Sequence, residues 1–340
     1  MSDLGGDGGA VSERQRSVGA AVGAHGGDID IAEAAAIAEQ APLPRAGRSK
    51  RAQRARQAAL GYLLLLPAFV IFAVFIFYPF AKNFELALYR TNPVNPNLRT
   101  YVGFDQISDV LQSDYLLSSL WTTVVFAVLT VPAGVLLGLA LAVAAHQRLR
   151  GIAIYRTLFS STVATSVAVA AVIFGTLFNP VIGWLPWLGF DPQPPLLEDP
   201  TWALPAVAIL TVWQNIGFAF IVMSAGLQAV PDEILEAAQI DGARAWRRFW
   251  RVTVPMLSPT LFFATVVGTI IAFQTFGQIH LLTKGGPGES TNVLAYAVYN
   301  SLNIRNDSGE AAVLAIALFF VTLTITGFQL RVLERRVHYA

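Results

Sequence analysis

PDEILEAAQIDGARAWRRFWRVTVPMLSP, residues 231–259, is a polar stretch between two apolar segments of a strongly apolar chain. Its first part, Asp232 to Asp241, is predicted to form a short helix. Pro231 suits a first helical turn, and acidic residues follow it at the positive end of the helix dipole. Gly242 is predicted to interrupt this helix, because glycine permits a turn or lets another backbone come close.

The second part of the stretch, Ala243 to Arg251, separates charged residues from aromatic ones. At about 100° per residue on a helix, its arginines form one stripe and its aromatic rings fall on the opposite side. Two interpretations stay open. One is a juxtamembrane helix with arginines among anionic headgroups. The other is a docking element whose aromatic face packs on its own bundle while other parts meet a partner. The residues concerned are Arg244, Arg247, Arg248, Arg251, Trp246, Phe249 and Trp250.

The composition indicates an integral membrane protein. Apolar residues make up 54% of the chain, charged residues only 13%, and the mean hydropathy is +0.54, whereas a soluble domain carries about 25% charged residues. The absence of cysteine excludes disulfides and cysteine-ligated metals. Because a bilayer requires roughly 20 apolar residues per helix, we expect an all-α integral membrane fold with six transmembrane helices. They are placed at about 58–80, 119–145, 157–178, 202–228, 258–283 and 311–333.

The distribution of Lys and Arg predicts the orientation. With both termini in the cytoplasm, 18 of these residues lie on the cytoplasmic side and 5 on the other, and the polar loop 231–259 is cytoplasmic. Residues 1–44 lack an apolar run and are predicted to form a disordered cytoplasmic tail. The basic segment 45–57 is read as a juxtamembrane anchor, with nucleic-acid binding as the alternative. Residues 58–340 form the six-span domain.

The polar loop resembles the EAA loop of ABC-importer permeases. Glu236-Ala237-Ala238, then Gly242, then Val252-x-Val254-Pro255 after nine intervening residues, has the spacing of that motif. Its only departures are two valines, at 252 and 254, in place of Ile and Leu. In that family the loop is the coupling helix that sits in a cleft of the ATP-hydrolysing subunit.

The resemblance runs from about residue 58 to the C-terminus and points to the carbohydrate uptake branch. Trp213…Gly217-Phe218…Gln228 is similar to the fourth-span signature of that branch, and Phe276…Leu282-Thr283-x-Gly285-Gly286-Pro287 to its fifth span and following loop. Within the branch, the sequence most resembles permeases for glycerol-3-phosphate and glycerophosphodiesters. Gly277 departs from the usual Asp, and Thr162 stands where a proline often kinks the third span. Both departures bear on the solute, for which a disaccharide or an amino sugar is the alternative.

The resemblance implies a permease subunit of an ATP-driven importer in the bacterial cell membrane. Its implied partners are a homologous second permease, two copies of an ATPase that binds ATP and Mg, and an extracytoplasmic solute-binding protein. This subunit itself would bind no cofactor and catalyse no reaction. The residues expected to couple it to the ATPase are Glu236, Ala237, Ala238, Asp241, Gly242 and Pro255.

A solute pathway needs polar groups and aromatic faces inside the membrane. Amides form hydrogen bonds with hydroxyl groups, and aromatic rings cover the apolar faces of sugars. The alternative is that these amides only join neighbouring helices. The candidates in spans four and five are Trp213, Gln214, Asn215, Phe218, Phe273, Gln274, Phe276 and Gln278.

The sequence disfavours other classes of protein. It has no Gly-x4-Gly-Lys-Ser/Thr motif for ATP hydrolysis, and its four histidines are too scattered for a metal site. The predicted spans hold no ionisable residue well inside their boundaries, as ion-coupled transport or membrane catalysis would need. An ATP-driven exporter is a further rival, which the likeness to importers disfavours.

Overall fold

The computed structural model describes residues 50–92, 95, 98–146, 151–189 and 192–333. The predicted tail 1–44 and the first part of the basic segment 45–57 lie outside the described residues. The chain divides into two compact units, Met1–Phe77 and Tyr78–Ala340, which are described separately.

The first unit contains one helical segment. Helix α3 (Lys50–Phe72) continues as the π-helix η1 (Ala73–Phe77), and the chain passes directly into α4 (Tyr78–Leu86) of the second unit. By length and composition, Ala55–Leu86 is a candidate membrane span. The predicted span at 58–80 is therefore confirmed, and the later part of the basic segment is helical.

Three long helices of the second unit can each cross a bilayer. They are α6 (Asp114–Ala145), α10 (Ala203–Gln228) and α17 (Ser308–Leu333). They confirm the predicted spans at 119–145, 202–228 and 311–333, except that α10 begins at Ala203, one residue after the predicted start. Helix α10 contacts α6, α7, α8, α14 and α15, so it is central to the packing of this unit.

The predicted third span, 157–178, is wrong as a continuous helix. Helix α7 (Ile152–Ser161) and the 3-10 helix η2 (Thr162–Ala164) are followed by α8 (Val167–Leu177), bent from them by 103°. The break coincides with hydroxyl residues, which offer the backbone hydrogen bonds that compete with a helix. The hydroxyl of Ser166 accepts a hydrogen bond from the Val169 amide at 3.3 Å and caps α8.

The predicted fifth span, 258–283, is also interrupted. Helix α14 (Ser258–Phe273) ends ten residues early, and α15 (Gly277–Leu282) follows as a separate short helix. Before α14, the helical segment Ala245–Met256 is bent from it by 66°. The chain therefore has four candidate spans among its described residues, or up to six if each bent pair is counted as one.

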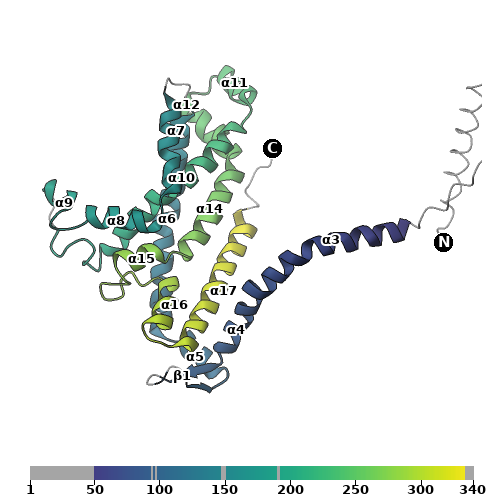
Figure 1. Ribbon diagram of the computed structural model, residues 1–340. Coiled ribbons are helices and arrows are strands. Elements are labelled where there is room, and N and C mark those ends of the chain that lie inside the picture. Colours follow the sequence, from purple (N-terminus) through teal and green to yellow (C-terminus); the bar gives the residue numbers. More distant parts are fainter. Residues whose placement is uncertain (1–49, 93–94, 96–97, 147–150, 190–191, 334–340) are drawn as a thin grey trace, which may run out of the picture. The chain divides into compact units, whose positions relative to one another are not determined.

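Short elements occupy both ends of the second unit (Figure 1). At one end lies α11 (Asp232–Ile240). At the opposite end are the antiparallel strands β1 (Tyr89–Thr91) and β2 (Arg99–Tyr101), with α5 (Asp105–Leu111) and α16 (Leu294–Asn303). A further short helix, α9 (Trp184–Trp187), lies between α8 and α10.

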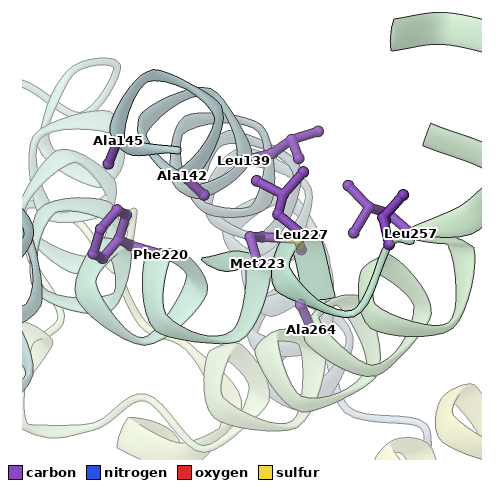
Figure 2. Packing of buried hydrophobic residues seen from close by; sticks show 9 residues of the cluster. Leu139, Ala142, Ala145, Phe220, Met223, Leu227, Leu257 and Ala264 are labelled. Carbon is purple, nitrogen blue, oxygen red and sulfur yellow. The ribbon is translucent and has the colours of Figure 1, made fainter. Parts of the chain in front are cut away.

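An apolar core joins the helices near α11 (Figure 2). Buried residues of α6, α10 and α14 pack together, and half-buried residues of α7 and α11 pack against them. We call this the α11-end cluster. Its buried members are Leu139, Ala142, Ala145, Phe220, Met223, Leu227, Val230, Leu257 and Ala264.

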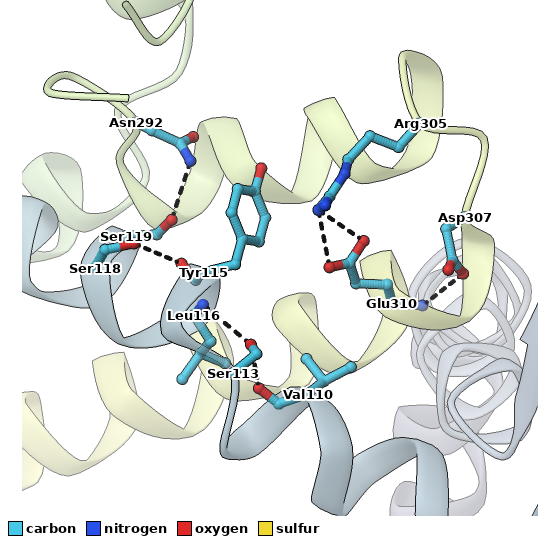
Figure 3. A network of polar contacts seen from close by, with 10 residues as sticks. All are labelled: Val110, Ser113, Tyr115, Leu116, Ser118, Ser119, Asn292, Arg305, Asp307 and Glu310. Atoms are coloured by element: carbon cyan, nitrogen blue, oxygen red, sulfur yellow. Dashed lines mark hydrogen bonds and ion pairs between the residues drawn. The ribbon is translucent and has the colours of Figure 1, made fainter. Parts of the chain in front are cut away.

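The opposite end of the second unit is held by polar contacts (Figure 3). The amide of the buried Asn292 donates to the Ser119 hydroxyl at 3.1 Å, which fixes the loop before α16 to α6. Arg305 forms hydrogen bonds of 2.9 and 3.0 Å with Glu310 and lies 4.5 Å from the ring centroid of Tyr115. This end is therefore tied together by side chains of α6, of α17 and of the loops on either side of α16.

Close packing between α6 and α10 depends on Gly138. A β-carbon at this position would meet the side chain of Ala219 and lie 2.9 Å from the Ala219 carbonyl carbon. One turn earlier, a β-carbon at Gly134 would meet nothing within 4 Å. Both glycines are buried, so they form a matched pair in which only one position lacks space for a side chain.

We predict that Gly138→Ala destabilises the folded subunit and that Gly134→Ala leaves its stability nearly unchanged. Overpacking at a close contact typically costs about 1–3 kcal/mol. The two purified variants are heated in detergent, and the fraction of protein that stays monodisperse is measured at each temperature. The unfolding midpoints of the two variants are then compared. Equal midpoints for the two variants would contradict the described contact between α6 and α10.

Candidate functional site

Helix α11 begins and ends as its sequence predicts. Pro231 is its N-cap residue, and Asp232 and Glu233 occupy its first turn. At its end Gly242 has a φ of +76°, the left-handed conformation that glycine adopts readily. The Gly242 amide donates to the Gln239 carbonyl at 3.1 Å and the Ala243 amide to that of Ala238 at 3.0 Å. These two bonds form a Schellman motif, which fixes where the helix stops.

One face of α11 rests on the bundle while the other is exposed. Leu235 is half-buried and packs against the α11-end cluster. On the opposite face Glu236, Ala237 and Ile240 are exposed, with Ile240 87% accessible. This face of the helix is therefore available for contact with another protein. Among the other coupling candidates, Asp241 and Gly242 are exposed and Ala238 and Pro255 half-buried.

The segment after Gly242 is less regular than predicted. The helix expected at 243–251 is present from Ala245 onward, but it is not a regular α-helix. Helix α12 (Ala245–Arg248) continues as the π-helix η3 (Phe249–Thr253) and then as α13 (Val254–Met256). A π-helix has i→i+5 bonds, so the spacing of about 100° per residue does not hold beyond Phe249. Arg248 donates to the Gln239 side chain at 3.2 Å, which links the two halves of the loop.

The aromatic face of this segment is only partly buried. Phe249 packs against the α11-end cluster, as the docking interpretation expects. Trp246 is 74% exposed and Trp250 49% exposed, and their rings meet edge to face with centroids 5.6 Å apart. The expectation that all three rings pack on the bundle is therefore wrong for the two tryptophans.

The pathway candidates of α10 point to two different faces of that helix. On one face the side-chain amide of Gln214 donates to the Thr165 carbonyl at 3.2 Å, and its oxygen accepts from Gln278 at 3.1 Å. This chain of amides joins the break in the third span to α10 and α15. In this conformation the two glutamines serve as contacts between helices, the alternative function considered for them.

Gly217 lies one turn after Gln214 and approaches the same break. Its backbone amide donates to the hydroxyl of Thr162 at 3.0 Å. A β-carbon at position 217 would collide with that hydroxyl and lie 2.9 Å from the Phe159 carbonyl oxygen. Helix α10 therefore holds the broken span through Gln214 and Gly217 together.

The other face of α10 lines a small cavity. Asn215 and Phe218 border a space of about 40 Å³ between α6, α10 and α14, together with Thr130 and Thr211. At roughly 10–15 Å³ per water, such a space holds a few water molecules but no sugar. Phe273 is buried in the core between α6 and α14 rather than in this cavity.

The remaining pathway candidates lie apart from that cavity. Trp213 packs against Phe174 of α8 with ring centroids 5.4 Å apart, and Gln274 is exposed at the end of α14. Phe276 stacks on His280 at 5.2 Å and meets Tyr296 and Tyr299 of α16. Burial raises the pKa of the Tyr296 phenol, so Tyr296 itself stays protonated near neutral pH.

Sequence reasoning missed the importance of the break in the third span. Thr162 and Thr165 supply the hydroxyl and the carbonyl that α10 binds, yet neither was among the pathway candidates. The available signal is a concentration of hydroxyl residues inside an otherwise apolar span, namely Ser160, Ser161, Thr162, Thr165 and Ser166.

Comparisons with known proteins identify relatives along most of the chain. Residues 116–339 match the family described as binding-protein-dependent transport system inner membrane component. The sn-glycerol-3-phosphate transport system permease protein UgpA of Agrobacterium fabrum is 38% identical over 82% of this chain and 96% of its own length. The UgpA proteins of Rhizobium meliloti and Escherichia coli O157:H7 are 39% and 32% identical, each again over 82% of this chain and 96% of the relative.

A solved structure shares the fold. It is a crystal structure of a bacterial ABC transporter involved in the import of the acidic polysaccharide alginate. The TM-score is 0.72 with 23% sequence identity, and the match covers 83% of this chain and 98% of the other. At this identity the likeness concerns the fold alone.

We predict a measurable coupling between Gln214 and Gln278. A double-mutant cycle with Gln214→Leu and Gln278→Leu should give an interaction energy of about 0.6 kcal/mol, and up to ~1.7 kcal/mol, as for other interhelical hydrogen bonds in membranes. Thermal stability of the purified protein in detergent provides the four values. Strict additivity of the two single substitutions would contradict the described amide chain.

Proposed function

The chain belongs to the family of inner-membrane components of binding-protein-dependent transport systems, and we propose that it imports a phosphorylated glycerol compound. The chain matches 96% of the length of its UgpA relatives, which are named as permease proteins of sn-glycerol-3-phosphate transport systems. That shared length is the observation that carries the proposal. The chain is a multi-pass membrane protein and the permease subunit of an ABC importer.

The proposed orientation puts α11 and both termini in the cytoplasm. The bias of Lys and Arg supports it, because 18 of 23 then face the cytoplasm. The end of the second unit that carries β1, α5 and α16 then faces outward. A solute-binding protein would deliver the solute to that side, in keeping with the description of the family.

Helix α11 is the proposed coupling helix. Its exposed face, with Glu236, Ala237 and Ile240, would contact the ATPase subunit, while Leu235 and Phe249 transmit force to the α11-end cluster. Two ATPase copies would bind ATP and Mg and supply the energy. ATP then changes the bundle only through contacts that differ between its two states.

The proposed solute pathway is shared with a homologous second permease. The cavity beside Asn215 and Phe218 is too small for a glycerol phosphate in this conformation. A larger hollow of about 440 Å³, which Trp213 lines, is bordered by apolar residues of α6 and α10 and offers no amide side chain to a solute. A polar solute site would therefore form when the bundle opens or when that partner completes it. Gln214 and Gln278 are the proposed hydrogen-bonding groups, because their amides match the hydroxyl groups of a glycerol compound. Trp213, Gln274 and Phe276 are secondary candidates.

The first test is a solute screen on the complete transporter with its binding protein in liposomes. We predict that glycerol-3-phosphate or a glycerophosphodiester stimulates ATP hydrolysis and that disaccharides and amino sugars do not. Omission of the binding protein is the control and should remove the stimulation. Stimulation by neutral sugars alone would contradict the proposed solute and leave the assignment to the family intact.

A second test addresses coupling through Gly242. Gly242→Val should abolish uptake, because a β-branched residue is strongly disfavoured at a φ of +76° and the end of α11 would be lost. Gly242→Asn is the matched control and should retain much of the activity, since Asn adopts this conformation more readily. A β-carbon at this position would meet no other residue of the chain within 4 Å, so a clash with neighbouring residues does not explain a loss.

The readouts for the two Gly242 variants are solute uptake and ATP hydrolysis, with membrane insertion checked by quantitative immunoblotting. We expect Gly242→Val to be inserted normally and to hydrolyse ATP without responding to the solute. Normal uptake by that variant would contradict a coupling function of α11.

A further inference from the structure

The third hydrophobic segment crosses too little of the membrane to be a complete span. Its straight part, Ile152–Ala164, is about 20 Å long at 1.5 Å per residue, against a hydrocarbon core of about 30 Å. Helix α8 then turns away by 103°. Helix α8 packs against Ala206 and Leu210, in the part of α10 that is farther from α11, so α8 lies in the half of the membrane opposite α11.

Helix α8 is apolar on two faces. On one face Ala170, Ala171 and Phe174 are buried against α10. On the other, Val169, Val172 and Ile173 are between 49% and 70% exposed. An exposed apolar face of this kind, continuous with a membrane-spanning bundle, is expected against lipid or another protein.

The chain after α8 extends this apolar surface. The side-chain oxygen of Asn179 accepts hydrogen bonds from the amides of Val181 at 2.8 Å and Ile182 at 3.1 Å, which folds the chain into a turn before α9. Leu185 of α9 packs against the core formed by α8 and α10. Trp184 and Trp187 are 70% and 85% exposed. Leu185 thus holds one side of α9 against the core, while the two tryptophans on its other side are exposed.

We propose that the outer faces of α8 and α9 lie in the lipid leaflet opposite α11, with Trp184 and Trp187 at its headgroup interface. Tryptophan prefers this interface because its ring is apolar and its N–H remains hydrogen-bonded. Residues 167–189 contain no Asp, Glu, Lys or Arg, so the surface offers no charge to water. A second permease could also cover an apolar face, and the observation that favours lipid is the pair of exposed tryptophans at the end of this surface.

This anchor has a structural consequence for the break at Thr162–Ser166. Helix α7 belongs to the bundle, whereas α8 would be held by both α10 and the leaflet. The amide chain from Thr165 through Gln214 to Gln278 then spans the junction between a membrane-anchored element and the central helix. Trp184 and Trp187 are positioning residues for that junction.

The chain has no cysteine, so single labels can be placed without background. Val172→Cys and Trp187→Cys would each carry a nitroxide in the complete transporter, assembled from cysteine-free partner subunits in liposomes. Gln112→Cys, exposed at the end of α5, is the water-exposed control. Collisions with oxygen, which enters lipid, and with a water-soluble nickel chelate are measured by power saturation.

We expect the oxygen-to-nickel collision ratio to be several-fold higher at residues 172 and 187 than at 112, and higher at 172 than at 187. A ratio at 187 equal to that at 112 would place α9 in water and overturn the proposal. Low access to both reagents would mean that a protein covers this face, which also overturns it. Val181→Cys, at a position 83% exposed in the same turn, repeats the test if Trp187→Cys impairs assembly.

Discussion

A backbone inside a lipid bilayer has no water to bond with, so each N–H and C=O needs a partner within the protein. The break in the third hydrophobic segment meets this constraint through side chains. Ser166 caps α8, and the Thr165 carbonyl accepts a hydrogen bond from the side-chain amide of Gln214. The bend of 103° and the course of α8 and α9 depend on these bonds, because an unsatisfied break at this depth would cost several kcal/mol.

Helix α10 connects this break to the proposed ATPase contact. Gln214 and Gly217 bind the break, while Phe220, Met223 and Leu227 belong to the α11-end cluster. From Gln214 to Gln228 the helix is about 21 Å long, and α11 begins a few residues later. A displacement of α11 would therefore reach the middle of the membrane along one continuous helix, without a separate relay.

Local signals in the sequence were sufficient for some elements and insufficient for others. The ends of α11 and the left-handed Gly242 follow from capping chemistry, which involves only neighbouring residues. The break at Thr162 was missed because hydropathy averages over a window and hides five hydroxyl residues. The pathway candidates separated because Gln214 and Asn215 lie about 100° apart on α10, and only the packed bundle decides which helix each one faces. Trp250 lies in η3, whose helical period differs from the one assumed for the sequence pattern.

We propose that the ATPase subunit binds the exposed face of α11. Ile240→Cys offers a direct measurement, since Ile240 is 87% exposed and the chain has no other cysteine. Its rate of modification by a polyethylene glycol maleimide would be compared in the permease alone and in the complete transporter with a cysteine-free ATPase. We expect the ATPase to protect this cysteine strongly from modification. Equal rates in the two preparations would contradict it.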